Sequence, residues 1–119
     1  MDAPRILVVD DDESVRYAVC LALSVLGYVP EAVSGASEAL ARFRPGRYRV
    51  VVTDVAMPVM NGLELARRLR ALEPGLPIMI FSGEYSLAES WPEVGGAMIA
   101  LKPDIDALTR LIQRALAGP

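Results

Sequence analysis

Short runs of β-branched and other apolar residues alternate along this chain with longer segments whose apolar residues recur every three or four positions. The short runs predict five strands, at residues 5–9, 29–33, 49–53, 78–81 and 97–101. The longer segments predict helices at about residues 14–26, 37–43, 62–72 and 104–117. The remaining segment, 84–96, contains Pro92 and Gly95-Gly96, so any helix there is expected to be short or irregular.

Strands that alternate with helices predict the α/β class, in which helices cover both faces of a parallel sheet. The near-continuous Val and Ile runs, such as Val50-Val51-Val52, are typical of strands buried on both faces. A length of 119 residues suits one core, so we expect a single domain over residues 1–119.

Composition excludes several classes of protein. Apolar residues make up 53% of the chain, but no apolar stretch approaches the roughly 18 residues of a membrane span. The first residues lack the basic start and apolar run of a signal peptide, so a cytoplasmic location is expected. The single cysteine, Cys20, excludes an internal disulfide and a cysteine-rich zinc site.

The charged residues argue against direct nucleic-acid binding. The net charge is −3, and the densest basic cluster is Arg67-Arg68 with Arg70. We interpret that cluster as a solvated helix face rather than a nucleic-acid surface, because an acidic domain without a basic stripe binds DNA poorly. The chain has no histidine, so any phosphohistidine that serves it belongs to a partner.

Polar residues follow three of the predicted strands directly. Asp10-Asp11, Asp54 and Lys102 come after the first, third and fifth strands, and Ser82 ends the fourth. The carboxyl ends of parallel strands share one edge of the sheet, so these side chains are expected to converge. Crowded carboxylates repel one another unless a cation joins them. The pattern therefore predicts a metal-assisted site that handles an anion.

Phosphoryl transfer is the chemistry that uses such a set. Mg²⁺ prefers oxygen ligands and often bridges carboxylates and a phosphate. An aspartate can itself be the nucleophile and form an aspartyl phosphate. The transfer needs cations to neutralise the equatorial oxygens, and here Mg²⁺ and Lys102 would supply them.

Each of these residues also has a simpler interpretation. The run Asp10 to Glu13 could cap the first helix, and we expect Asp12 or Glu13 to do so. Lys102 could be an ordinary surface lysine, and Ser82 with the following glycine could be only a turn. The joint pattern, in which each polar residue ends its own strand, favours a site.

Four stretches in order carry a resemblance to a known family. They are ILVVDDDESVR at 6–16, VVTDVAMPVMNGLEL at 51–65, IMIFSG at 78–83 and LKP at 101–103. On these stretches the chain resembles the receiver domains of two-component response regulators over essentially its whole length. The resemblance implies a flavodoxin-like fold of five β/α units, with strand order 2-1-3-4-5.

The resemblance implies a role for each matched position. Asp54 would be the phosphoacceptor, Lys102 would contact the phosphoryl group, and Ser82 would turn toward the phosphate. Asp11 would ligate Mg²⁺ directly, with Asp10 assisting through water. Asp54 and the Ala56 carbonyl would complete the metal ligands from the protein. The Lys102-Pro103 peptide would be cis.

The resemblance also implies partners. The phosphoryl donor would be a histidine kinase or a histidine phosphotransfer protein. The modified domain would act as a switch on a downstream effector protein or a fused output domain, with no membrane contact. It would catalyse only its own phosphorylation and dephosphorylation and would turn over no metabolite.

The chain departs from the family's pattern in two places. Ile99 stands where the family usually carries Tyr or Phe, so the coupling of phosphorylation to output is expected to differ. The span from Ser82 to Lys102 is also a residue or two shorter than is usual in the family. Tyr85 and Trp91 lie in this span, where they either cover the sheet or form an aromatic contact for a partner.

The first helix carries an unusual second face, whose residues are Tyr17, Cys20, Leu21 and Ser24. A solvated face normally carries more charge. An exposed apolar patch suggests a binding surface, so we expect a helical partner or a homodimer contact here, the alternative being a tolerated apolar surface.

Two other classes of function remain as alternatives. The first is a receiver-like interaction module that signals without phosphorylation, which Ile99 favours and the complete set of acids and lysine opposes. The second is a flavodoxin or a haloacid-type phosphatase. The acidic run after the first strand would repel a flavin phosphate, and Ala56 stands where such a phosphatase would carry its second acid.

Overall fold

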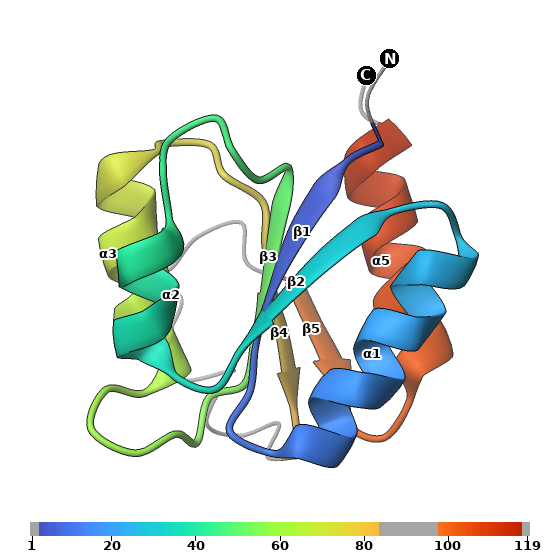
Figure 1. Cartoon of the computed structure of the whole chain (residues 1–119), viewed down its shortest axis with the longest axis horizontal. Helices are drawn as coiled ribbons and strands as arrows, with labels where there is room; N and C mark the ends of the chain where they lie inside the picture. The colour runs from blue at the N-terminus through green and yellow to red at the C-terminus, as the bar shows by residue number, and fades with distance from the viewer. Residues whose placement is uncertain (1–2, 84–97, 118–119) are drawn as a thin grey trace.

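The computed structural model describes residues 3–83 and 98–117, and it contains a five-stranded parallel sheet between two layers of helices. The elements are β1 Arg5–Val9, α1 Glu13–Val25, β2 Val29–Val33, α2 Ala36–Arg42, β3 Val50–Thr53, α3 Gly62–Leu72, β4 Ile78–Ser82, β5 Met98–Leu101 and α5 Ile105–Ala117. The strand order is β2-β1-β3-β4-β5, which confirms the predicted topology. Helices α1 and α5 cover one face of the sheet, and α2 and α3 cover the other (Figure 1).

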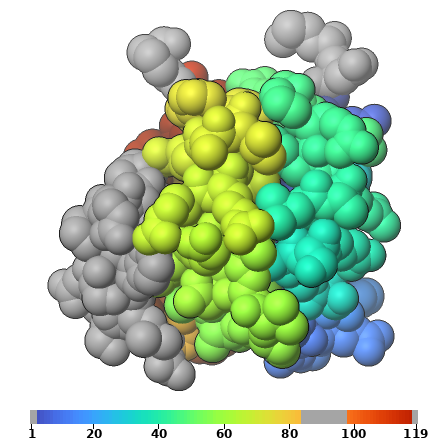
Figure 2. Space-filling model, turned by 90° about the vertical axis from the view of Figure 1, so that its left-hand side faces the viewer, coloured from blue at the N-terminus to red at the C-terminus, as the bar shows by residue number. Residues whose placement is uncertain are grey.

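Alternation along the strands divides the interior into two cores. Leu7 and Val9 of β1 face the α2 and α3 layer, where they join a buried cluster with Phe43. Ile6 and Val8 of the same strand face the α1 and α5 layer. This follows from the period of two in a strand, because successive side chains point to opposite faces. Figure 2 views the α2 and α3 side, with α3 in yellow-green beside α2 in teal.

The start of α1 follows from its cap. The Asp12 carboxylate accepts hydrogen bonds from the backbone N–H groups of Ser14, at 2.9 Å, and Val15, at 3.4 Å. These bonds satisfy two of the N–H groups that a helix start leaves without partners. The Ser14 hydroxyl donates to the same carboxylate at 2.7 Å, and this bond, together with the two backbone bonds, lowers the pKa of Asp12. The prediction that Asp12 or Glu13 caps this helix is confirmed for Asp12.

Leu26 and Leu72 continue the apolar spacing of the first and third predicted helices, which predicts that they face the interior, but the structure leaves both exposed. Leu26 is 40% exposed because α1 ends at Val25 and the chain turns at Gly27, whose φ is +91°. Leu72 is 53% exposed because α3 ends there. The predicted irregular segment 84–96, with Tyr85 and Trp91, lies outside the described residues.

The polar residues of the predicted site occupy one edge of this sheet. Asp10 and Asp54 directly follow β1 and β3, and Lys102 directly follows β5. Ser82 is the last residue of β4, which runs one residue further than predicted. Across the two ranges that the structure describes, no helix is both long and apolar enough to cross a membrane.

Candidate functional site

Lys102 joins two of the predicted acids at the carboxyl edge of the sheet. Its Nζ lies 2.8 Å from Asp10 Oδ2 and 3.2 Å from Asp54 Oδ2. Burial alone would lower the pKa of this lysine, but the hydrogen bonds and charges of Asp10 and Asp54 outweigh burial and raise it. Lys102 is therefore a charged amine held between two carboxylates, which excludes the interpretation of an ordinary surface lysine.

Asp54 is a buried carboxylate that the backbone holds in place. It is 7% exposed, and its backbone N–H donates to the Val9 carbonyl at 3.0 Å. Its Oδ1 accepts a hydrogen bond from the Val55 N–H at 2.8 Å, and its Oδ2 faces Lys102. Burial raises the pKa of Asp54, while Lys102 opposes the rise and Asp10 adds to it. The side chain is thus fixed in place and poorly solvated.

Asp10 is held from both sides. It is 2% exposed, and its Oδ1 accepts a hydrogen bond from the Asp12 N–H at 2.9 Å. Its backbone carbonyl accepts a hydrogen bond from Arg16 Nη1 at 2.8 Å. Arg16 therefore ties the first turn of α1 to the end of β1. The sequence pattern did not identify this role, because a single arginine on a helix gives no periodic signal.

The carboxylates of Asp10, Asp11 and Asp54 form one cluster. One oxygen from each lies within 4.8 Å of the other two, and Asp11 is the exposed member. Three carboxylates and the Lys102 ammonium leave two negative charges at the site. A hard divalent cation with oxygen ligands fits this donor set and this charge. The structure therefore brings together the three acids that the sequence predicts as metal ligands.

The loop after β3 is set by a glycine. The Gly62 N–H donates to the Val55 carbonyl at 2.9 Å, and a Cβ at position 62 would overlap the Asp54 carbonyl oxygen. The Thr53 hydroxyl donates to that same oxygen at 2.9 Å. Glycine at position 62 lets α3 begin directly against the backbone of Asp54. Within this loop, Ala56 is exposed on the acidic side of the sheet.

β4 and β5 complete the edge. Ser82 is 1% exposed, and its carbonyl accepts a hydrogen bond from the Lys102 N–H at 2.9 Å. The Lys102-Pro103 peptide is cis, as predicted. Ile99 is half-buried against the core on the α2 and α3 side. The position that differs from the family's usual aromatic is therefore filled by an aliphatic side chain in contact with that core.

Known proteins share this sequence pattern and this fold. A family model described as the response regulator receiver domain matches residues 6–113. The chain belongs to this family. Response regulator MprA of Mycolicibacterium vanbaalenii is 37% identical over 113 residues, which cover 95% of this chain and 49% of that protein. The chain thus spans about half the length of the curated relatives it matches. Receiver domains of response regulators act in general as phosphorylation-dependent switches.

Solved structures show the same fold for this receiver domain. Chemotaxis protein CheY4 of Vibrio cholerae is 30% identical with a TM-score of 0.85, covering 95% of this chain and 98% of that one. Response regulator protein TrrA of Thermotoga maritima was solved in complex with Mg(2+)-BeF. It is 26% identical with a TM-score of 0.85, covering 94% of this chain and 98% of that one. Receiver domains bind Mg²⁺ at an acidic pocket of the kind formed by Asp10, Asp11 and Asp54.

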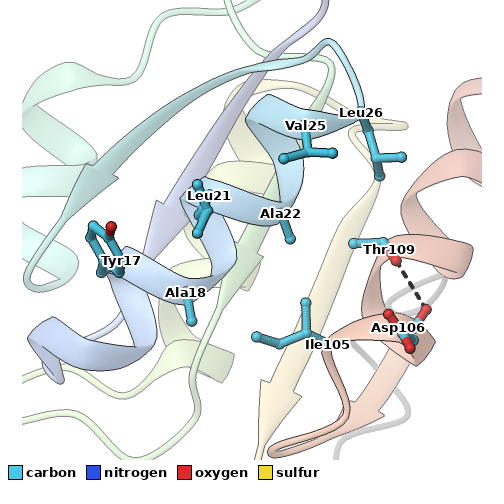
Figure 3. Close-up of a pocket in the computed structure, with 9 residues that line it drawn as sticks. All are labelled: Tyr17, Ala18, Leu21, Ala22, Val25, Leu26, Ile105, Asp106 and Thr109. Carbon is cyan, nitrogen blue, oxygen red and sulfur yellow. Dashed lines mark hydrogen bonds between the residues drawn. The ribbon is translucent and has the colours of Figure 1, made fainter.

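The receiver also carries an apolar groove between α1 and α5 (Figure 3). Its volume is about 490 Å³, and the residues that line it are Tyr17, Ala18, Leu21, Ala22, Val25, Leu26, Ile105, Asp106 and Thr109. Tyr17 is 71% exposed and Val25 is 79% exposed, far more than apolar side chains in a core. The prediction of an exposed apolar face on this helix is confirmed for Tyr17 and Leu21, whereas Cys20 is half-buried against the core.

The groove leads to the acidic edge. A second hollow, of about 210 Å³, is lined by Ala18 and Ile105, which also line the groove, and by Lys102 and Pro103. The lining of the groove is therefore continuous with that of a hollow that reaches Lys102, the residue that contacts Asp54. The predicted solvated helix face is confirmed for Arg67 and Arg68, which are exposed and pair with Glu64 on their own helix. Arg70 of the same cluster is half-buried and donates to the Leu76 carbonyl at 2.7 Å.

Proposed function

We propose that Asp54 accepts a phosphoryl group from the phosphohistidine of a partner protein, in a Mg²⁺-dependent reaction, and that this modification switches the domain between two states. The observation that carries the proposal is the position of Asp54. It is a buried carboxylate 3.2 Å from a lysine ammonium, with two further carboxylates within reach of one cation.

The transfer is a substitution at phosphorus. A carboxylate oxygen of Asp54 forms the new P–O bond as the P–N bond of the phosphohistidine breaks, and the electron pair of that bond goes to the imidazole nitrogen. Lys102 lies where it can neutralise a phosphoryl oxygen on Asp54. The Ser82 hydroxyl, at the end of the neighbouring strand, would donate to another. Water would later cleave the acyl phosphate and return the carboxylate.

Asp10, Asp11, Asp54 and the Ala56 carbonyl would hold the metal ion. When bound, Mg²⁺ supplies positive charge to the attacking carboxylate and to the phosphoryl oxygens. The oxygens of the three carboxylates already lie within 4.8 Å of one another. The oxygen donors and the excess of two negative charges support Mg²⁺ over a softer metal.

The donor is proposed to dock a helix in the groove between α1 and α5. The chain has no histidine, so a phosphohistidine that serves it belongs to a partner, either a histidine kinase or a phosphotransfer protein. The groove is apolar, and its lining continues through Ala18 and Ile105 to Lys102. A helix with apolar residues at three- and four-residue spacing would fill the groove and bring its phosphohistidine to the acidic edge.

Output is proposed to pass to a downstream effector or a fused output domain, through a shift between pre-existing states. Ile99 lacks a ring and a hydroxyl and is in contact with the α2 and α3 core, so it cannot report the phosphoryl group by an aromatic rotation. We place the domain in the cytoplasm, with no metabolic substrate and no direct contact with nucleic acid.

A second candidate is a receiver-like module that binds partners without being phosphorylated. The observation that favours it is Ile99 at the position of the usual aromatic. One experiment separates the two functions, because only the first requires covalent modification of Asp54.

The test is intact-mass spectrometry after incubation with acetyl phosphate, with and without Mg²⁺. We expect a gain of one phosphate that requires Mg²⁺ and is lost in Asp54→Asn. With acetyl phosphate, which does not use the docking groove, Asp106→Asn is the matched control, because Asp106 is exposed on α5 and should leave the modification intact. If neither acetyl phosphate nor a panel of phosphorylated histidine kinases modifies the protein, the phosphate-independent module is the correct function.

A further inference from the structure

A separate hollow, rich in arginine, lies at the amino edge of the sheet, at the opposite ends of the strands from Asp54. Its volume is about 390 Å³, and the residues that line it are Ala3, Pro4, Arg5, Gly46, Arg47 and Arg49. Half of the lining residues are arginines, and none is acidic. The chain as a whole has a net charge of −3, so this concentration of positive charge is not a general property of its surface.

A single carboxylate organises the arginines around the hollow. Glu31 of β2 has a side chain that is only 15% exposed, and it lies 2.9 Å from Arg5, 3.6 Å from Arg47 and 3.8 Å from Arg42. The Tyr48 hydroxyl donates to the same carboxylate at 2.9 Å. This carboxylate holds three guanidinium groups in position. Arg42 also lies 3.9 Å from Glu38, so the three guanidinium groups and the two carboxylates leave one positive charge in excess.

Two further contacts define the donors that remain. The Arg47 guanidinium lies 5.6 Å from the centre of the Tyr48 ring, a cation–π contact that fixes it further. The Arg49 N–H donates to the Arg5 carbonyl at 2.9 Å, which places the two residues side by side. Within residues 3–83 and 98–117, the Arg49 guanidinium has no hydrogen bond or ion pair. The Gly46 N–H donates to the Glu73 carboxylate and is not available to a ligand. The arginine side chains are therefore the donors that could bind one.

The chemistry of these donors suits an oxyanion such as phosphate. A guanidinium group presents two parallel N–H donors that match two oxygens of a phosphate, and it stays charged at every physiological pH. The hollow is compact, and the protein around it is acidic, which disfavours a long polyanion. We propose that this arginine hollow binds a small anion with two adjacent phosphate groups, a diphosphate, with Arg49 as its main ligand.

The test is isothermal titration calorimetry with inorganic pyrophosphate and with ADP, in EDTA so that no metal bridges either to the acidic edge. We expect saturable binding at low salt with a Kd of about 1 mM or below. Arg49→Gln should weaken it by roughly tenfold, and Arg49→Lys should weaken it less because the charge remains. The matched control is Arg68→Gln, an exposed arginine on α3 that should leave the Kd unchanged.

The two ligands identify the source of the diphosphate. Equal affinity for pyrophosphate and ADP means that only the phosphates are recognised. Tighter binding of ADP means that the nucleoside contributes. Either result supports the site if binding is weakened by Arg49→Gln. Three outcomes overturn it: no saturable binding to about ten times the expected Kd, equal weakening by Arg68→Gln, or tighter binding of a single-stranded oligonucleotide than of pyrophosphate. Circular dichroism of each variant excludes loss of folding as the cause.

Discussion

Gly62 and Asp54 are in contact through the backbone, because α3 begins against the carbonyl of the proposed phosphoacceptor. A Cβ at position 62 would overlap that carbonyl oxygen and would also come within 2.9 Å of the Thr53 hydroxyl. We expect Gly62→Ala to lower the free energy of unfolding by about 2–4 kcal/mol, since the backbone must shift. Urea denaturation measures this change. Gly35→Ala is the control, because nothing lies within 4 Å of its Cβ position, and a similar loss there would refute a local cause.

Metal binding should stabilise the fold through the acidic cluster. Mg²⁺ at ten times its Kd should raise the free energy of unfolding by about 1.4 kcal/mol, because it binds only the native state. The thermal midpoint, measured against magnesium concentration at constant ionic strength, reports this effect. Asp11→Asn should remove the dependence on magnesium and Asp106→Asn should keep it. An unchanged dependence in Asp11→Asn would show that Asp11 is not a ligand.

A charge placed in the α1–α5 groove should separate docking from chemistry. Leu21 is 52% exposed, so Leu21→Glu is tolerated by the fold but places a carboxylate in an apolar groove. Transfer from a phosphorylated protein donor should fall by about tenfold or more, while the rate with acetyl phosphate stays within about twofold. Leu72→Glu is the matched control, since Leu72 is equally exposed on the other layer. Equal transfer by both variants would exclude the groove as the docking site.

Glu31 should make stability depend on pH. Burial alone would raise the pKa of Glu31, but the Tyr48 hydroxyl and the arginines outweigh burial and lower it below its ordinary 4.5. A lowered native pKa contributes stability above the unfolded value, and this contribution is lost as pH falls through the native value. The difference in unfolding free energy between wild type and Glu31→Gln should therefore be constant, at about 1 kcal/mol, from pH 5 to 8.

Below pH of about 4.5 that difference should shrink, because the unfolded and then the native carboxylate become protonated. Chemical denaturation at a series of pH values gives the curve. A difference that grew toward acid pH would have the wrong sign and would reject this assignment.

Val59 adopts a backbone conformation that suits other residues better. Its φ is +71°, in the left-handed region that β-branched residues avoid, and its side chain is fully exposed. Val59→Asn should therefore raise the free energy of unfolding by about 1 kcal/mol, because asparagine tolerates this region and no packing is lost. Val59→Ala should give less, because alanine loses the β-branch but lacks the side-chain amide that can hydrogen-bond locally in this region. Guanidinium denaturation of the three proteins would show the order.

The sequence predicted most element bounds to within a residue because each element has its own local signal, whereas the strand order was implied by the family resemblance. Apolar runs mark the strands, and Asp12, Gly27 and Gly62 mark helix ends. The convergence of Asp10, Asp54 and Lys102 was also predictable, since parallel strands end at one edge. The errors at Leu26 and Leu72 arise at helix ends, where periodicity cannot tell the last buried turn from the cap.

Contacts between distant segments had no such signal. The ion pairs that bring Arg5 and Arg47 to Glu31 join residues from three separate segments, and no spacing links them. Only one side of the α1–α5 groove was predicted. The sequence showed the apolar face of α1, but it gave no sign that Ile105 and Thr109 of α5 would form the other side. Only the three-dimensional arrangement shows which surfaces meet.

The two cores limit how the sheet can respond to chemistry at Asp54. Neighbouring residues of β3 belong to opposite layers, so a slide of this strand by one residue would bring each side chain to the wrong layer. The sheet is therefore expected to stay rigid when Asp54 is modified. Conformational changes are expected in the segments beyond the strand ends. Hydrogen exchange should accordingly stay slow in β1 and β3 in both states, with the difference between them falling in the turns next to the acids.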